Sequence, residues 1–172
     1  MKLRNIDMET FLAIFGAEGL ELVEGHVFDL GILNQAIANQ IGLGDMQAAS
    51  LPFLYEGETE PCMSIFINQD SVLADMDLLT RLNTEARQRV FRGYLVHELV
   101  HVKQTADGRL TEVDGVSYWE GVAVEITTVV NGAYFNTPWE QEAYVAQFMY
   151  LGNCSEQEAL EQLQSLINKH AA

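Results

Sequence analysis

Residues 90–104, VFRGYLVHELVHVKQ, are the stretch that decides the fold and the chemistry expected of this chain. Inside this mostly apolar segment, His97, Glu98 and His101 form the spacing H-E-x-x-H. Residues four apart lie on one face of a helix, with their Cβ atoms about 5–6 Å apart. Two imidazoles placed in this way can bind one metal ion, so the spacing predicts a metal site on a largely buried helix.

Helix geometry also assigns a separate place to Glu98. Imidazole nitrogens bind Zn²⁺ at about 2.0–2.1 Å, and zinc lowers the pKa of a bound water to about 7. Glu98 is rotated about a quarter-turn from His97, so its carboxylate is expected beside the metal, where it can accept a proton from that water. The motif therefore predicts a hydrolase in which Glu98 activates a metal-bound water.

A catalytic zinc site with two helical histidines needs a third protein ligand and one open position. Residues 136–148, NTPWEQEAYVAQF, are expected to begin a helix that has Glu140 and Glu142 near its start. Glu140 can also complete a capping box with Thr137, and in that case Glu142 becomes the candidate ligand. More remote candidates, as ligands or as partners of the imidazole N–H groups, are Asp114, Glu120 and Glu125.

The motif HELVH, followed by Glu-x-x-Ala at residues 140–143, resembles the zincin metallopeptidases, specifically their gluzincin-like members. The resemblance covers about residues 85–150. It implies a Zn²⁺-dependent peptidase that acts on a peptide or protein substrate, with Glu140 as the third ligand. Some relatives have Asp or Asn directly after the alanine, where this chain has Tyr144.

Hydrolysis of a peptide bond creates an oxyanion that needs a hydrogen-bond donor besides the metal. Tyr134, six residues before Glu140, is the leading candidate for this donor. Tyr118 and Tyr144 are the alternatives.

The rest of the sequence predicts an α+β fold. Helices are expected over residues 7–18 and 30–41, from 71 to 105 with a break near 83, and from 138 and 155 onwards. Strands are expected at 51–56 and 62–69 on either side of a turn, and in short pieces after Asp107-Gly108. We therefore expect one zincin-like domain over residues 1–172, in which a small sheet packs on the long H-E-x-x-H helix with further helices around it.

Composition restricts the function classes. The 172 residues include 25 acidic and 9 basic ones, and the formal net charge of −16 argues against nucleic-acid partners. No apolar stretch approaches the roughly 18 residues of a membrane span, and Asp7 and Glu9 interrupt any resemblance to a secretory signal. We therefore expect a cytoplasmic protein that has no membrane partner.

Two other hypotheses remain open at this point. An acidic interaction or inhibitor protein with a structural or degenerate metal site would also account for the charge of −16. The segment around Cys62, upstream of the H-E-x-x-H motif, resembles the cysteine segment of peptide deformylases. That resemblance implies an amidohydrolase in which Cys62 is a metal ligand.

Overall fold

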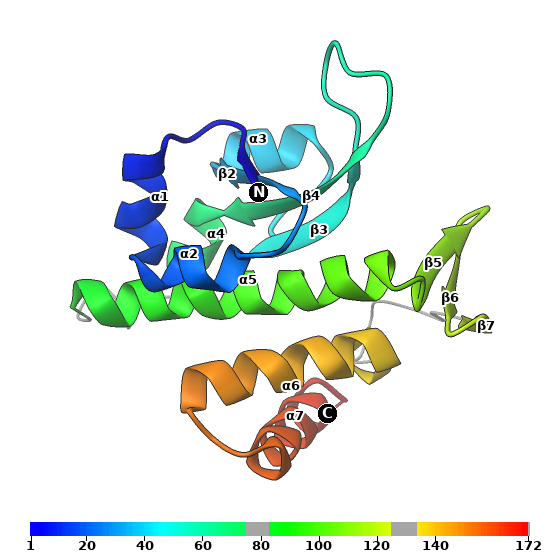
Figure 1. Cartoon of the computed structure of the whole chain (residues 1–172). Coiled ribbons are helices and arrows are strands. Elements are labelled where there is room, and N and C mark those ends of the chain that lie inside the picture. Colours follow the sequence, from blue (N-terminus) through cyan, green and yellow to red (C-terminus); the bar gives the residue numbers. More distant parts are fainter. Residues whose placement is uncertain (75–82, 125–133, 172) are drawn as a thin grey trace. The chain divides into compact units, whose positions relative to one another are not determined.

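The computed structural model describes residues 1–74, 83–124 and 134–171 (Figure 1), except for the side chains of Tyr134, His170 and Ala171. The chain forms two compact units, Met1–Leu99 and Val100–Ala172. The boundary between them falls inside one long helix, α5, which runs over Thr84–Ala106. Helices and two small sheets together confirm the expected α+β class. The assignment of residues 1–172 to a single zincin-like domain stays a prediction.

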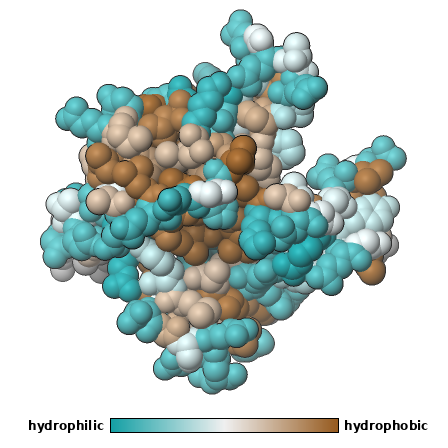
Figure 2. Space-filling model, in the orientation of Figure 1, coloured by the Kyte–Doolittle hydropathy of each residue, from teal (hydrophilic) through white to brown (hydrophobic). Residues whose placement is uncertain are grey.

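The first unit contains a four-stranded sheet in the order β1-β2-β4-β3. Its strands are β1 (Lys2–Leu3), β2 (Asp29–Leu33), β3 (Ala48–Phe53) and β4 (Cys62–Asn68). β2 runs parallel to both β1 and β4, whereas β3 is antiparallel to β4. The last pair confirms two neighbouring strands joined by a turn, although β3 begins and ends three residues before the predicted strand 51–56. The tip of this connection contains three glutamates and is mostly hydrophilic in Figure 2.

The prediction of a helix over residues 30–41 is wrong in its first part. Asp29–Leu33 forms β2, in which every residue is buried and Leu30 pairs with Ile65 of β4. A short apolar run suits a strand that is covered on both faces as well as it suits a helix, and here sheet pairing decides the outcome. The helix α3 covers only Gln35–Gln40, and the side chain of Asn34 caps it by accepting a hydrogen bond from Ile37 N at 3.0 Å.

Helices of the first unit pack through aromatic side chains. The helix α1 (Met8–Phe15) is capped by Asp7 and ends at Gly16, where φ is 70°, so it is shorter than the predicted helix 7–18. Phe11 and Phe15 are fully buried, and the Phe15 ring contacts Phe91 of α5 edge-on at a centroid distance of 6.3 Å. The remaining helices of this unit are α2 (Glu18–Val23) and α4 (Gln69–Ala74).

One buried cation anchors the first half of α5. Arg92 is 2% exposed and donates a hydrogen bond to the carbonyl oxygen of Phe15 at 2.8 Å. Its guanidinium also pairs with Glu18 at 2.9 Å and with Glu85 at 2.7 Å. These contacts connect α5 to the end of α1 and the start of α2, so the beginning of the motif helix has a defined position within its unit.

The second unit contains the last residues of α5, a three-stranded antiparallel sheet and two helices. The sheet consists of β5 (Leu110–Val113), β6 (Val116–Trp119) and β7 (Val122–Val124), as the β-prone pieces predict. After the short helix η2 (Tyr134–Asn136) come α6 (Pro138–Gly152) and α7 (Glu156–Ala171), which pack against each other. The predicted capping box of α7 is confirmed, because Ser155 N donates to Glu158 Oε2 at 2.8 Å.

None of the helices in the described part of the chain is long and apolar enough to cross a lipid bilayer.

Candidate metal centre

The helix α5 supplies both histidines of the motif. It continues without interruption from Thr84 to Ala106, and its start is capped by the side chain of Asn83, which accepts from Ala86 N at 2.9 Å. His97 and His101 lie one turn apart on this helix and are 7% and 8% exposed. Because both belong to one continuous helix, helix geometry itself sets their positions relative to each other.

The first turn of α6 supplies a carboxylate. Pro138 occupies the first turn of the helix, as the sequence predicts, and the next two residues, Trp139 and Glu140, are 4% and 1% exposed. The Trp139 ring lies 6.3 Å from that of Trp119 on β6, and this packing turns one face of α6 inward. A carboxylate in the first turn also benefits from the positive end of the helix dipole.

These three side chains form one buried group. The Nε2 atom of His101 lies 3.2 Å from Oε1 of Glu140. His97, His101 and Glu140 each offer one ligand atom, and these atoms all lie within 4.8 Å of one another. For comparison, two ligands bound at zinc distances in a tetrahedron are about 3.3 Å apart. Two imidazoles and one carboxylate are also the donor set of an open zinc site, so in chemistry these residues could hold a metal ion such as zinc.

Glu142, the alternative third ligand, does not belong to this group. It is exposed and accepts hydrogen bonds from Arg109 at 2.9 Å and from Gln104 at 3.3 Å. Its hydrogen bond raises the pKa of the Arg109 guanidinium. The Thr137 side chain makes no capping hydrogen bond at the start of α6. Of the two glutamates considered, Glu140 is therefore the one that lies with the histidines.

Gln104 is a buried residue of the site that the sequence analysis did not identify. It is 1% exposed, and its Oε1 lies 2.9 Å from Nδ1 of His101. Its amide nitrogen donates to the carbonyl oxygen of Trp139 at 3.1 Å. The sequence contains a signal for this contact, since residue 104 follows His101 by three and so lies on the same helix face.

Glu98, the proposed general base, is 4% exposed and directly follows His97 on α5. A buried carboxylate next to a metal-binding face is costly unless it has a partner or a chemical role. The role of Glu98 as the base stays a prediction.

The sequence also named candidates for the oxyanion donor and for more remote metal ligands. Tyr134 begins η2, but its side chain lies outside the described part of the chain, as does all of Glu125. Tyr144 packs between the rings of Phe135 and Phe148. The remaining candidates lie on the three-stranded sheet: Asp114 at the β5–β6 turn, Tyr118 on β6, and Glu120, which pairs with Arg109.

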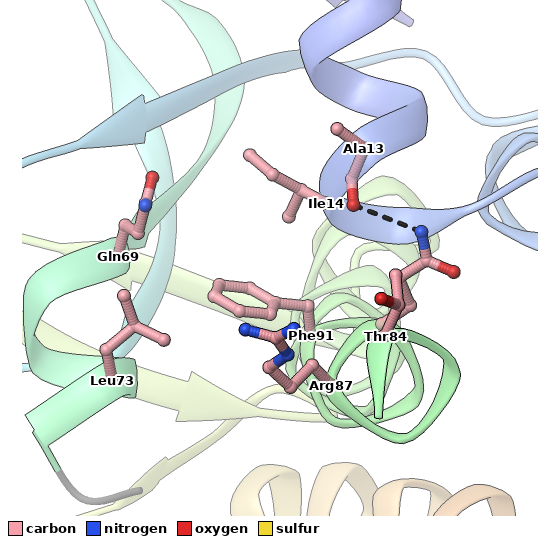
Figure 3. Close-up of a pocket in the computed structure, with 8 residues that line it drawn as sticks. Ala13, Ile14, Gln69, Leu73, Thr84, Arg87 and Phe91 are labelled. Atoms are coloured by element: carbon pink, nitrogen blue, oxygen red, sulfur yellow. Dashed lines mark hydrogen bonds between the residues drawn. The ribbon is translucent and has the colours of Figure 1, made fainter. Parts of the chain in front are cut away.

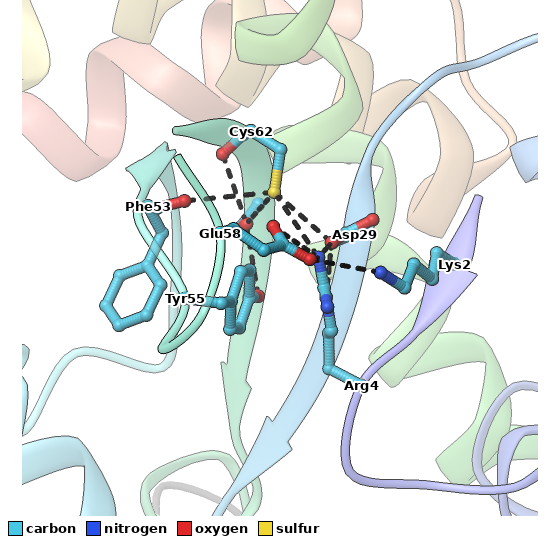
Figure 4. A network of polar contacts seen from close by, with 8 residues as sticks. Lys2, Arg4, Asp29, Phe53, Tyr55, Glu58 and Cys62 are labelled. Atoms are coloured by element: carbon cyan, nitrogen blue, oxygen red, sulfur yellow. Dashed lines mark hydrogen bonds and ion pairs between the residues drawn. The ribbon is translucent and has the colours of Figure 1, made fainter. Parts of the chain in front are cut away.

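Cys62, the metal ligand of the deformylase hypothesis, lies in a polar cluster of the first unit (Figure 4). Its thiol donates to Asp29 at 3.2 Å and lies 3.8 Å from the guanidinium of Arg4. Arg4 pairs with Asp29, donates a hydrogen bond to the Glu58 carboxylate at 2.8 Å, and lies over the Tyr55 ring at 3.9 Å from its centroid. Among the residues the structure describes, the metal-binding group consists of His97, His101 and Glu140 and does not include Cys62.

The first unit contains a pocket between α1, α4 and α5 (Figure 3). Ile14, Leu73 and Phe91 contribute apolar side chains to it, and Gln88 at its edge donates to the Ala13 carbonyl oxygen at 3.0 Å. None of the histidines or acidic residues discussed above lines this pocket. It therefore adds nothing to the assignment of the metal centre.

Comparison with known proteins does not place the chain in a family. No family model matches it, and neither a curated protein nor a solved structure does so. What is shown is a buried group, His97, His101 and Glu140, that could hold a metal ion.

Proposed function

We propose that this protein is a zinc-dependent metallopeptidase. The observation that supports the proposal is the burial of His97, His101 and Glu140 in one group, on two helices, with ligand atoms within 4.8 Å of one another. A metal site of this donor set leaves one coordination position for water or substrate, as catalytic zinc sites do.

Each residue of the site has a definite role in this proposal. His97, His101 and Glu140 hold the ion, which when bound makes water acidic and polarises a carbonyl group. Glu98 accepts the proton of the attacking water and later transfers it to the leaving amine. Tyr134 is the proposed donor to the oxyanion, on the basis of its place in the sequence just before α6.

The proposed substrate chemistry follows from the same groups. Substrate is proposed to be a peptide or a protein, because an amide carbonyl needs a Lewis acid, a water nucleophile and a proton carrier together. The net charge of −16 favours neutral or basic peptides over acidic ones. Nucleic acids and membranes are not proposed as partners, and the cytoplasm is the proposed compartment.

The decisive experiment separates metal binding from proton transfer. Glu98→Gln keeps the size of the side chain but removes the base, so peptide hydrolysis should fall at least about 100-fold while the zinc content of the purified protein stays near one ion per chain. Glu161→Gln, at an exposed position of α7, is the matched control and should leave both quantities unchanged. Full hydrolysis by Glu98→Gln would refute the assigned base, and absence of bound zinc in the unaltered protein would refute the metal site.

The alternative function is an acidic interaction or inhibitor protein in which the metal is structural. The extreme charge of the chain is the observation that favours it. The same experiment distinguishes the two functions: a zinc-loaded protein that hydrolyses no member of a diverse peptide library, and in which Glu98→Gln changes only stability, would support the interaction protein.

A further inference from the structure

Gln104 connects the two helices of the candidate metal centre. It lies on α5, three residues after His101, and is 1% exposed. One end of its amide contacts His101 Nδ1 at 2.9 Å, and the other end contacts Trp139 O at 3.1 Å and Glu142 Oε2 at 3.3 Å. Trp139 directly precedes Glu140, so a single side chain connects the histidine to the backbone beside the carboxylate.

The partners of Gln104 determine which way its amide points. A backbone carbonyl oxygen and a carboxylate oxygen only accept hydrogen bonds, so both must face the NH₂ group of the amide. The carbonyl oxygen of Gln104 is then left to face His101 Nδ1. Because an amide oxygen only accepts, Nδ1 must be the protonated nitrogen of the ring.

A proton on Nδ1 defines the function of the other ring nitrogen. Nε2 lies on the opposite side of the imidazole, 3.2 Å from Oε1 of Glu140. A metal ion requires an unprotonated ring nitrogen, and the hydrogen bond made by the second nitrogen selects which one that is.

We propose that Gln104 is a positioning residue that keeps the proton of His101 on Nδ1 and thereby presents Nε2, together with Glu140, to the metal. This inference rests on the proposed metal site and adds to it a residue that touches neither metal nor substrate. It also gives Glu142 a role: Glu142 is held by Arg109 at 2.9 Å and accepts from the Gln104 amide, so it stabilises the amide orientation instead of binding the metal.

Nuclear magnetic resonance of selectively ¹⁵N-histidine-labelled protein tests the inference directly. His101 should carry a proton on Nδ1 both in the metal-free protein and in the zinc-loaded protein, and this proton should exchange slowly with water. In Gln104→Met, which keeps the side-chain volume but removes the acceptor, the Nδ1 proton should exchange much faster. A metal-free protein in which Nδ1 is unprotonated and Nε2 carries the proton would overturn the inference.

Zinc affinity, measured by competition with a chelator, gives the second readout. Loss of a partner of this kind typically weakens metal binding about 10–100-fold, so we expect that change for Gln104→Met. The double variant Gln104→Glu/Glu142→Gln restores an acceptor for Nδ1–H and a donor from residue 142, whereas the Trp139 carbonyl oxygen loses its donor, so it should bind zinc more tightly than Gln104→Met and less tightly than the unaltered protein. Gln164→Met, at an exposed position of α7, is the control and should bind as the unaltered protein does.

The outcomes of these measurements are distinguishable. If the unaltered protein binds no zinc, the proposed function fails, while the proton position in the metal-free protein still decides the role of Gln104. If zinc binds and Gln104→Met binds it as tightly as the unaltered protein, the metal site stands and the positioning role is refuted. Should Gln104→Met fail to fold, as judged by circular dichroism, the proton position in the unaltered protein and the affinity of the double variant remain decisive.

Discussion

The Nε2 atom of His101 and the Oε1 atom of Glu140 lie 3.2 Å apart, and both side chains are almost completely buried. The first comes from α5 and the second from the first turn of α6, 39 positions later in the chain. An imidazole lone pair and a carboxylate that face each other away from water are unfavourable unless a proton or a cation lies between them. A proton or a cation held between these two groups would therefore link α5 to α6 within the second unit.

Glu140→Gln removes the charged ligand and keeps its shape. Zinc affinity should fall by more than the roughly 10–100-fold that is typical of residues outside the ligand shell. Glu142→Gln is the matched control two residues away. Arg109 and Gln104 donate to different carboxylate oxygens of Glu142, so the single amide oxygen of this variant keeps only one of these contacts, and its zinc affinity should change by about tenfold or less. Competition with a chromogenic chelator measures the zinc affinity of both variants. A larger loss of affinity for Glu142→Gln than for Glu140→Gln would identify Glu142 as the ligand.

Removal of the metal should lower the thermal stability of the protein. A ligand that binds only the folded state, at a free concentration of about 1,000 times its Kd, stabilises that state by about 4 kcal/mol. Thermal unfolding followed by circular dichroism, with zinc and with a chelator, measures the difference. His101→Ala, which lacks one ligand, should unfold at nearly the same temperature in both solutions. Equal unfolding temperatures for the unaltered protein would contradict a folded-state metal site.

Arg92 should be important for the stability of the first unit. In Arg92→Met the carbonyl oxygen of Phe15 loses its buried donor, while Glu18 and Glu85 remain in water at 63% and 67% exposure. We expect the free energy of unfolding to fall by about 2–3 kcal/mol, because an unsatisfied buried acceptor costs more than a lost surface ion pair. Equilibrium unfolding in urea measures this free energy for both proteins.

Lys103→Ala is the control for Arg92→Met. Lys103 is 66% exposed and pairs with Asp107 one turn away at 2.7 Å. Such a pair contributes about 0.3–0.5 kcal/mol. A loss for Lys103→Ala as large as that for Arg92→Met would show that burial is not the cause.

The cluster around Arg4 should contribute a pH-dependent part of the stability. The hydrogen bond from Arg4 lowers the pKa of Glu58 in the folded protein. A carboxyl group with a lowered pKa stabilises the fold fully above its unfolded value of about 4.3 and loses that contribution as the pH falls through its folded value. Glu58→Gln should therefore be less stable than the unaltered protein at pH 7. The two proteins should be equally stable at a pH below the folded pKa of Glu58, where this carboxyl group is protonated.

Glu60→Gln provides the comparison for Glu58→Gln. Glu60 is exposed and belongs to the same connection between β3 and β4. Its replacement removes one negative charge from this connection and leaves the ion pair between Arg4 and Glu58 in place. If Glu58→Gln and Glu60→Gln give the same curve between pH 3 and pH 7, the ion pair with Arg4 makes no contribution in solution.

The difference between prediction and structure at residues 30–41 has a simple physical origin. The apolar run of Leu30, Ile32 and Leu33 has helical spacing, but it equally suits a short strand that is buried on both faces. Local sequence does not contain the pairing partner, and Ile65, which pairs with Leu30, lies 35 residues further along the chain. The pairing energy of the sheet overrides local preference here.

The choice between Glu140 and Glu142 could have been predicted in part from helix spacing. Trp139, Ala143 and Gln147 are four residues apart and all buried, so they define the inner face of α6. Glu140 lies next to this face, whereas Glu142 lies away from it. The spacing of Trp139 and Ala143 thus favours Glu140, but it does not show that the inner face of α6 lies against His101.

The amino-acid sequence by itself determined the relation between His97 and His101, because one helical turn separates any two residues four apart in a helix. It also determined the α+β class, the start of α6 at Pro138 and the capping box of α7, since these depend on local patterns. Only the tertiary structure decided that Glu140 lies beside His101 and that Gln104 joins their two helices. Contacts between residues far apart in the chain depend on how helices rotate and pack, and no local pattern specifies that packing.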